Sequence, residues 1–355
     1  MEPSLLNLRR ASIEHLRSTM APKDLDLSDF MANLRAQHCA IEPRDAIFAD
    51  LVHAQKMSLL SPQADDDKER KILFVVGGSD AGKSKMIKHA IATDPAFALR
   101  HDEYGRPVNP IVRIRAPNPC SLRNIGILLL EAVGYPIRSD AKETYVWPLV
   151  PGQLARRGVM FVVIEEAQRV MKLDDWYEQS KVWDTLINLV DNEHWPVRLI
   201  LAGMPILEKL REAEEQIQNR SKIQKLMPIP ATKYPIVSTW IKTIISEHAG
   251  LELRNLPVDD VSKRLIHASE GNTGAIFKLI MSSVELVMSL GDRKTVTTID
   301  FAQAYHNATG CSIDTNIFEQ SNWKNLPSGA AKTKNPKKDL QNVAGKARKA
   351  GDRPR

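Results

Sequence analysis

Apolar residues along this chain form short continuous runs in its first two thirds and helical spacings afterwards. The continuous runs are rich in β-branched residues and predict buried parallel strands at 72–76, 110–115, 159–164 and 197–202. Spacings of three and four residues predict helices between and after them, at 122–133, 182–190 and 208–216. From Pro235 to about residue 308 only helical spacing is found. Alternating strands and helices followed by helices alone predict a parallel α/β domain and a small all-α domain.

The segments outside this pattern suggest where the domains divide. Weak helical spacing over residues 1–30 predicts an appended helix, and residues 30–58 predict a firmer helix broken at Pro43. Residues 61–70 are a charged linker, and 138–149 are expected to be irregular. The expected divisions are an N-terminal extension, an α/β core, a helical lid and a basic tail, at 1–30, 31–232, 233–310 and 311–355.

A glycine loop lies between the first predicted strand and the helix after it: Gly77-Gly78-Ser79-Asp80-Ala81-Gly82-Lys83-Ser84. The order of strand, Gly-x-x-x-x-Gly-Lys-Ser and helix is typical of a phosphate-binding P-loop. Glycines let backbone N–H groups surround an anion, and the helix N-terminus adds partial positive charge. We expect Lys83 to reach the β- and γ-phosphates of ATP, and Ser84 to ligate Mg²⁺. The structural alternative is a tight glycine turn that binds nothing.

Two carboxylates, Glu165 and Glu166, end the third predicted strand. P-loop ATPases carry a magnesium-binding acid at such a strand end, which we expect next to the P-loop strand. Glu165 is the expected metal ligand beside Ser84, and Glu166 the expected general base for an attacking water. Taken alone, two acids after a strand are usually solvated turn residues. The P-loop upstream favours the catalytic interpretation.

Composition narrows the class of protein only slightly. At 43% hydrophobic and 26% charged, the chain is ordinary for a globular protein. The apolar runs are too short to span a bilayer, and charged residues interrupt any signal-peptide core near the N-terminus. Its three cysteines lack the spacing of a zinc site or a disulfide framework. We expect a reduced, cytoplasmic protein without a membrane partner.

The net charge of +6 is concentrated at the C-terminus. Residues 324–355 hold ten Lys or Arg against two Asp, a net charge of +8, which leaves −2 for residues 1–323. A segment so basic and so poor in apolar residues is not expected to fold alone. It either binds nucleic acid or an acidic partner, or is simply a solvated end.

The order of the P-loop, the strand acids and the later segments along the chain resembles that of the AAA+ ATPases of DNA transposition. These are the TniB and TnsC type, with phage MuB as a more distant relative. The resemblance covers about residues 31–308; the P-loop and the strand acids indicate only the wider ATPase class. The stretches that point to the family are 111–136, Ile164–Gln168, 189–205, Gln218–Arg220 and Ser269–Gly274. The implied fold is α/β: an AAA+ P-loop NTPase with a parallel sheet core, a small all-α lid and a disordered basic C-terminal tail.

The resemblance also implies roles for residues outside the P-loop. Arg220 matches the arginine finger that reaches the γ-phosphate in a neighbouring subunit, where a guanidinium offers two parallel donors. Alternatively, Arg220 is a surface cation that caps a helix C-terminus. Met204 stands where relatives usually carry a polar sensor residue. Residues 271–274 lack the arginine that many AAA+ proteins carry at this position. Lys278, one helical turn further on, would take its place next to the nucleotide. These departures predict slow hydrolysis rather than loss of ATP binding.

Double-stranded DNA is the partner that the family implies, encircled by a ring or helical filament of subunits. The positions that match DNA-tracking loops are Arg123, Arg138, Lys142 and Thr144. Such side chains contact phosphates and give affinity without sequence preference. Exposed loop charges without a ligand are the alternative.

The function expected from the resemblance is ATP-dependent regulation of transposition. The protein would link a TniQ-type targeting protein to the transposase on DNA and hydrolyse ATP for disassembly. Two alternatives stay open at this point. One is an AAA+ ATPase of the initiator or helicase-loader kind, and the other is a nucleotide-gated scaffold that does not hydrolyse ATP.

Overall fold

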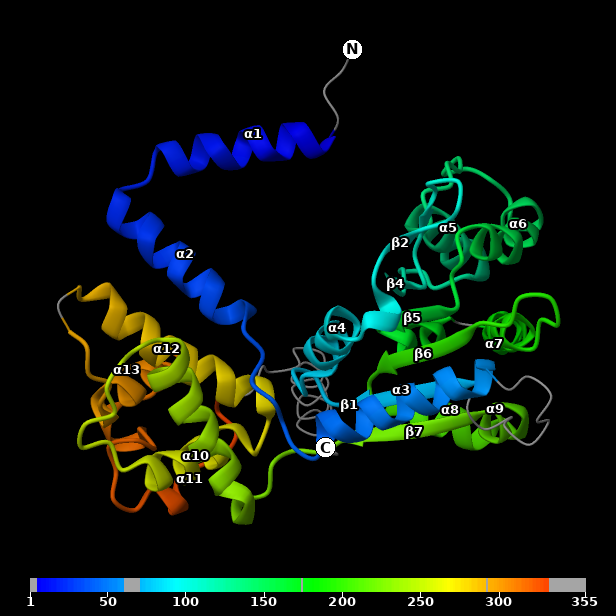
Figure 1. Cartoon of the computed structure of the whole chain (residues 1–355). Helices are drawn as coiled ribbons and strands as arrows, with labels where there is room; N and C mark the ends of the chain where they lie inside the picture. Colours follow the sequence, from blue (N-terminus) through cyan, green and yellow to red (C-terminus); the bar gives the residue numbers. More distant parts are fainter. Residues whose placement is uncertain (1–4, 61–70, 174, 292, 332–355) are drawn as a thin grey trace, which may run out of the picture. The chain divides into compact units, whose positions relative to one another are not determined.

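The computed structural model describes residues 5–60, 71–173, 175–291 and 293–331 (Figure 1). The chain divides into two compact units. One comprises residues 40–227 and is called the sheet unit below. The other, called the helical unit, combines the residues up to 39 with those from 228 onward.

A five-stranded parallel sheet in the order β4-β5-β6-β1-β7 forms the centre of the sheet unit (Figure 1). Its strands are β1 (Ile72–Gly77), β4 (Ile111–Arg115), β5 (Phe161–Glu165), β6 (Arg198–Gly203) and β7 (Ser221–Leu226). Strand β1 lies between β6 and β7, and all six of its residues are buried. In parallel sheets of this kind, ligands bind at the carboxyl ends of the strands, so the loop after β1 lies where a ligand site is expected.

Helices cover both faces of the sheet. Because side chains alternate along a strand, Phe74 and Val76 face one core cluster while Leu73 and Val75 face another. The first face packs against α5 (Leu122–Ala132), α6 (Glu143–Arg156), α7 (Trp176–Val190), α8 (Ile206–Ala213) and α9 (Glu215–Asn219). The second packs against α3 (Arg44–Leu60) and α4 (Lys83–Thr93). The core is therefore two apolar layers with the sheet between them.

Two elements of the sheet unit differ from the sequence predictions. Residues 138–149 were expected to be irregular, yet α6 runs from Glu143 to Arg156 with Pro148 and Pro151 inside it. Val146, Val150 and Leu154 follow a four-residue spacing and are buried, so packing outweighs the prolines, each of which costs about 3 kcal/mol in a helix interior. Strand β7 has no continuous apolar run because it is an edge strand. A small antiparallel pair, β2 (Arg100–His101) with β3 (Pro107–Val108), precedes β4.

The helical unit contains the remaining helices: α1 (Leu5–Ser18), α2 (Pro22–Ala36), α10 (Tyr234–Lys242), α11 (Val258–Ser269), α12 (Thr273–Ser289) and α13 (Thr298–Thr309). A π-helical turn, Thr243–His248, extends α10. Trp240, Phe301 and Tyr305 are the largest of its fully buried side chains. Helix α2 contacts α12 and buries Met31 and Leu34. None of the helices in the described chain is long and apolar enough to cross a bilayer.

The compact units divide at different positions from those expected. Their limits fall at 39/40 and 227/228, whereas the sequence placed the limits of the core at 30/31 and 232/233. The sequence also placed the start of the tail at residue 311. Within 311–331, however, Ile317, Phe318 and Trp323 are buried, so this segment is packed against the helical unit. The rest of the predicted tail, 332–355, lies outside the described residues.

Candidate functional site

The loop of residues 77–84 joins the carboxyl end of β1 to the first turn of α4. Gly82 is the N-cap residue of α4 and has a φ of 86°, which glycine adopts without strain. A Cβ on Gly77 would lie 3.0 Å from the Cβ atoms of Ala81 and Leu226, whereas one on Gly78 would meet no atom within 4 Å. The first turn of α4 has no acidic side chain and no side-chain cap. The loop therefore leaves an open helix N-terminus, which favours an anion.

Lys83 lies within this loop, with its ammonium directed at the loop backbone. Nζ donates hydrogen bonds to the carbonyl oxygens of Gly77 at 2.8 Å and Gly78 at 2.7 Å. Burial lowers the pKa of Lys83, and the negative charges of Glu166, Asp80 and Glu165 partly offset that shift. A partly desolvated cation among three carboxylates interacts strongly with any anion that enters. Its carbonyl partners are ones that a phosphate oxygen can replace.

Ser84 and Glu165, the two residues expected to bind Mg²⁺, lie within hydrogen-bond distance of each other. The Ser84 hydroxyl donates to Glu165 Oε2 at 3.0 Å, and Arg113 of β4 lies 3.4 Å from Glu165 Oε1. The expectation that the strand bearing Glu165 lies next to the P-loop strand is wrong, because β6 lies between β5 and β1. The two side chains still meet because both leave the carboxyl edge of the sheet.

A glutamine to which the sequence assigns no role connects Glu166 to the neighbouring strand. Gln168 Nε2 donates to Glu166 Oε2 at 2.8 Å, while Gln168 Oε1 accepts from the backbone N–H of Met204 at 3.1 Å. Gln168 is buried, and a Cβ on Gly203 would lie 2.3 Å from its Oε1. The glycine that ends β6 thus makes room for this amide. Gln168 thus places a polar side chain next to Met204, the position at which the family resemblance implies a polar sensor.

Arg44 is a second residue without a sequence signal. It lies at the start of α3, and its NH1 donates to the Ala81 carbonyl oxygen of the P-loop at 3.1 Å. Asp45 holds the guanidinium through Nε at 2.8 Å, and only 13% of the Arg44 side chain is exposed. No motif marks a lone arginine 37 residues upstream of the loop it contacts. The P-loop is therefore flanked by two cations, Lys83 and Arg44.

Arg220 lies at the opposite end of the sheet from the P-loop, where it is the C-cap residue of α9. Its Nε donates to Asp191 Oδ2 at 2.8 Å, and its NH1 donates to the Gln216 carbonyl oxygen at 3.2 Å. Lys71 contacts the other oxygen of Asp191 at 2.5 Å. Burial alone would raise the pKa of Asp191, but the hydrogen bonds from Lys71 and Arg220 lower it overall. In this chain, Arg220 thus makes the helix-capping contact of the structural alternative.

Lys278 and the segment 271–274 belong to the helical unit. Asn272 caps α12 by accepting from the N–H of Ala275 at 3.0 Å, and Lys278 is exposed on that helix. Gly271 has a φ of 70°, and its carbonyl oxygen accepts from the N–H of Ile229 at 2.8 Å. A contact of Lys278 with the nucleotide stays a prediction.

The four predicted DNA-binding residues surround the loop before α6. Arg123 donates to the carbonyl oxygens of Ser139 and of Ala141, the latter at 2.6 Å, so it holds the loop in place. Arg138 is exposed and forms a two-bond pair with Asp140. Lys142 is the exposed N-cap residue of α6, and Thr144 is exposed in its first turn. All but Arg123 line a surface hollow of about 520 Å³ together with Tyr145.

The residues at the P-loop fit ATP and Mg²⁺. An open helix N-terminus, a lysine hydrogen-bonded to two loop carbonyls and a Ser–carboxylate pair lie together after the carboxyl ends of β1 and β5. In the described chain no cluster of three or more His, Cys, Asp or Glu could hold a metal alone. Mg²⁺ characteristically takes one or two protein ligands and completes its shell with phosphate and water. Ser84 and Glu165 would supply that pair.

Comparison with known proteins agrees with this geometry. Residues 65–210 match a family described as AAA domain. A search of curated proteins gives no match. Solved structures that are similar include the Aeropyrum pernix ORC1 protein in complex with DNA, with a TM-score of 0.53 and 15% identity over 76% of this chain and 66% of that chain. This chain therefore spans just under two thirds of that protein.

Two further structures have the same overall fold. The ADP form of the Aeropyrum pernix ORC2 protein has a TM-score of 0.51 and 16% identity, over 79% of this chain and 75% of that one. Cdc6p from Pyrobaculum aerophilum has a TM-score of 0.51 and 12% identity, over 75% and 69%. At such low identity the likeness concerns the fold. The chain has the AAA+ P-loop ATPase fold: a parallel five-stranded α/β core followed by a helical part.

Proposed function

We propose that this protein binds ATP with Mg²⁺ at the P-loop, hydrolyses it, and assembles on double-stranded DNA in its ATP-bound state. The observation that carries the proposal is the meeting of Ser84 with Glu165 at 3.0 Å, beside a Lys83 whose partners are P-loop carbonyls. A glycine turn with a purely structural role would need neither an acid opposite the serine nor a partly desolvated lysine in the loop.

Each residue has a distinct task in hydrolysis. Lys83 binds the β- and γ-phosphate oxygens in place of its present carbonyl partners. Ser84 and Glu165 hold Mg²⁺, which supplies neutralisation of the phosphate charge when bound. Glu166 accepts a proton from the attacking water on its carboxylate. Gln168, which donates to one Glu166 oxygen, fixes the direction in which the other faces.

Arg220 is proposed to act in trans. Ser221 pairs with Ile72 and Leu226 with Gly77, so Arg220 lies six residue steps, roughly 20 Å, from the P-loop of its own chain. An arginine side chain cannot cover that distance, so the proposed partner of Arg220 is the site of a neighbouring subunit. Release from Asp191 would precede that contact, because Arg220 Nε now donates to Asp191.

For the DNA contact we propose the loop before α6. Arg138, Lys142 and Thr144 are exposed around one hollow and have the chemistry of phosphate contacts. Arg123 is assigned a supporting role, because at least three of its five donors already hold neighbouring groups. DNA as partner is supported by the similar ORC1 structure, which is a complex with DNA.

The biological setting proposed from the sequence resemblance is transposition, in which the assembled protein links a TniQ-type targeting protein to the transposase. A second candidate is an initiator or helicase loader, favoured by the structural similarity to ORC and Cdc6 proteins. If the ATP-bound protein retains purified transposase but not replicative helicase, the transposition function is favoured. If it retains the helicase but not the transposase, the initiator or helicase-loader function is favoured.

The experiment for the proposal is duplex binding with ATP, with ADP and without nucleotide. Lys83→Ala should abolish ATP-dependent assembly, because the phosphates lose the P-loop cation. Lys88→Ala removes an exposed lysine from the same helix and should behave like wild type. If Lys83→Ala assembles normally with ATP, the assignment of the site is wrong.

A further inference from the structure

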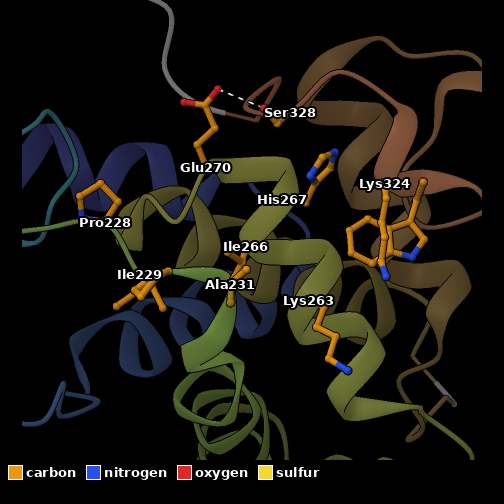
Figure 2. Close-up of a pocket in the computed structure, with 11 residues that line it drawn as sticks. Pro228, Ile229, Ala231, Lys263, Ile266, His267, Glu270, Lys324 and Ser328 are labelled. Atoms are coloured by element: carbon orange, nitrogen blue, oxygen red, sulfur yellow. Dashed lines mark hydrogen bonds between the residues drawn. The ribbon is translucent and has the colours of Figure 1, made fainter.

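The helical unit contains a cavity of about 640 Å³ that has no part in the proposed nucleotide chemistry. Three segments surround it: a proline-containing linker of residues 228–231, helix α11, and a C-terminal strap that we define as residues 323–331. Figure 2 shows Pro228, Ile229 and Ala231 on one side and Lys324 and Ser328 on the other, with Ile266 of α11 between them. The size lies within the range of pockets that bind small organic groups.

Backbone contacts fix the linker wall. Ile229 N–H donates to the Gly271 carbonyl oxygen at 2.8 Å. A Cβ on Gly271 would lie 2.1 Å from the Ile229 carbonyl oxygen, and its φ of 70° also favours glycine. Pro228 and Pro230 restrict the backbone on either side of Ile229. This wall is formed before any occupant arrives.

The strap wall is held in the same way. Gly329 N–H donates to the His267 carbonyl oxygen at 3.1 Å, and Ala331 N–H donates to that of Ala268 at 3.0 Å. His267 Nε2 contacts the Leu326 carbonyl oxygen at 2.9 Å. Ser328 donates to Glu270 at 3.3 Å (Figure 2). A preformed cavity spares the occupant the entropic cost of ordering the walls.

The lining has an apolar interior and a basic rim. Ile229, Ile266 and Trp323 supply the apolar surface, and Lys263 and Lys324 are exposed at the edge. Glu270 is the single carboxylate among the lining residues, and it accepts from Ser328. The cavity therefore suits an apolar side chain accompanied by negative charge.

A nucleobase is a poor occupant because the indole of Trp323 is already covered. Arg264 and Lys324 lie over its ring, at 5.4 and 5.7 Å from the centroid, and His267 meets it edge-on at 5.3 Å. Only 8% of Trp323 is exposed. Recognition of single-stranded nucleic acid depends on an open aromatic face on which a base can stack.

The chain's own tail is disfavoured by charge. Residues 332–355 follow the strap directly in sequence and carry nine Lys or Arg against two Asp. The positive charges of this tail would be repelled by Lys263 and Lys324 at the rim. The same two lysines would attract a partner that carries acidic residues.

We propose that this cavity docks a short segment of a partner protein, in which an apolar side chain is flanked by Asp or Glu. The apolar side chain occupies the space between Ile229, Ile266 and Trp323, and the carboxylates pair with Lys263 and Lys324. The proposal goes beyond the nucleotide site and does not depend on it.

The test is selection of random twelve-residue peptides displayed on phage against the full-length protein without nucleotide. Enriched peptides are synthesised and their Kd measured by fluorescence anisotropy in 50 mM salt. Ala231→Trp fills the cavity from an exposed position, and Lys263→Glu with Lys324→Glu reverses the rim. Lys242→Glu, an exposed lysine of α10 outside the cavity lining, is the matched charge control.

We expect enriched peptides with an apolar residue between acids. Their Kd should rise at least about tenfold in Ala231→Trp, and about three- to tenfold in the double Lys variant, with no change in Lys242→Glu. If Ala231→Trp does not fold, the Lys variants decide alone. No enrichment, enrichment of basic peptides, or equal binding by the rim variants would overturn the proposal. Loss of duplex DNA binding in the same rim variants without acidic peptides would assign the cavity to nucleic acid instead.

Discussion

Replacement of Gln168 by leucine tests how the proposed base is held. The change keeps most of the side-chain volume but removes both of its hydrogen bonds, to Glu166 at 2.8 Å and from Met204 at 3.1 Å. Gln168 does not itself touch phosphate in the proposed mechanism, so it acts as a positioning residue. Its loss should lower turnover of ATP without a matching loss of ATP binding.

The structure sets the size of both effects. A hydrogen bond to a charged group contributes about 1.5–3 kcal/mol, and the loss of such a contact in the transition state would lower kcat about 10- to 100-fold. The N–H of Met204 also loses its acceptor, which costs about 1–3 kcal/mol of folding free energy. KM for ATP should change little, because Lys83 and Ser84 are untouched.

Gln168→Glu separates these two effects. Its carboxylate still accepts from Met204, so the cost of an unpaired N–H is avoided, and the change in free energy of unfolding reports the cost of a buried carboxylate beside Glu166. The donor to Glu166 is lost and a like charge takes its place, so kcat should fall at least as far. The assays are steady-state ATP hydrolysis and urea denaturation. If both variants hydrolyse ATP within twofold of wild type, Gln168 has only a structural role and the reasoning is refuted.

Two further predictions concern assembly and the tail. Arg220→Ala should bind ATP yet hydrolyse it slowly. Mixing it with Lys83→Ala on saturating DNA should restore part of the activity, because at one kind of mixed interface an intact Lys83 meets an intact Arg220. Mixed oligomers without restored activity would make Arg220 a structural partner of Asp191. Deletion of residues 332–355, which follow the packed strap, should leave ATP hydrolysis intact. It should weaken duplex binding in low salt, because nine Lys or Arg are lost. An unchanged DNA affinity would make the tail a solvated end.

Much of the fold could be predicted from the sequence because its signals are local. Strand β1 reads as a continuous apolar run because helices cover both faces of the sheet. The P-loop follows from glycines whose backbone roles no other residue fills, as at Gly82. Ser84 and Glu165 could be paired because parallel strands end at one edge of the sheet.

What the sequence did not reveal depends on contacts between distant segments. Helix α6 exists because Val146 and Val150 are buried, which outweighs the prolines that favour an irregular segment. Strand β7 has the polar pattern of an edge and no apolar run. Gln168 ends a stretch that supports the family resemblance, but nothing in the sequence assigns its amide a role, and Arg44 carries no motif. Their contacts with Met204 and with the P-loop arise only when separate elements pack together.

The measurement that tests the account most directly is ATP turnover and ATP binding by Glu166→Gln, side by side with wild type. The change keeps the shape and hydrogen bonding of the side chain but removes the proton acceptor. Turnover should fall about 10²–10⁴-fold while ATP binding persists, so that the variant stays on duplex DNA after wild type has dissociated. Unchanged turnover, or loss of ATP binding together with turnover, would contradict a nucleotide site in which Glu166 is the base.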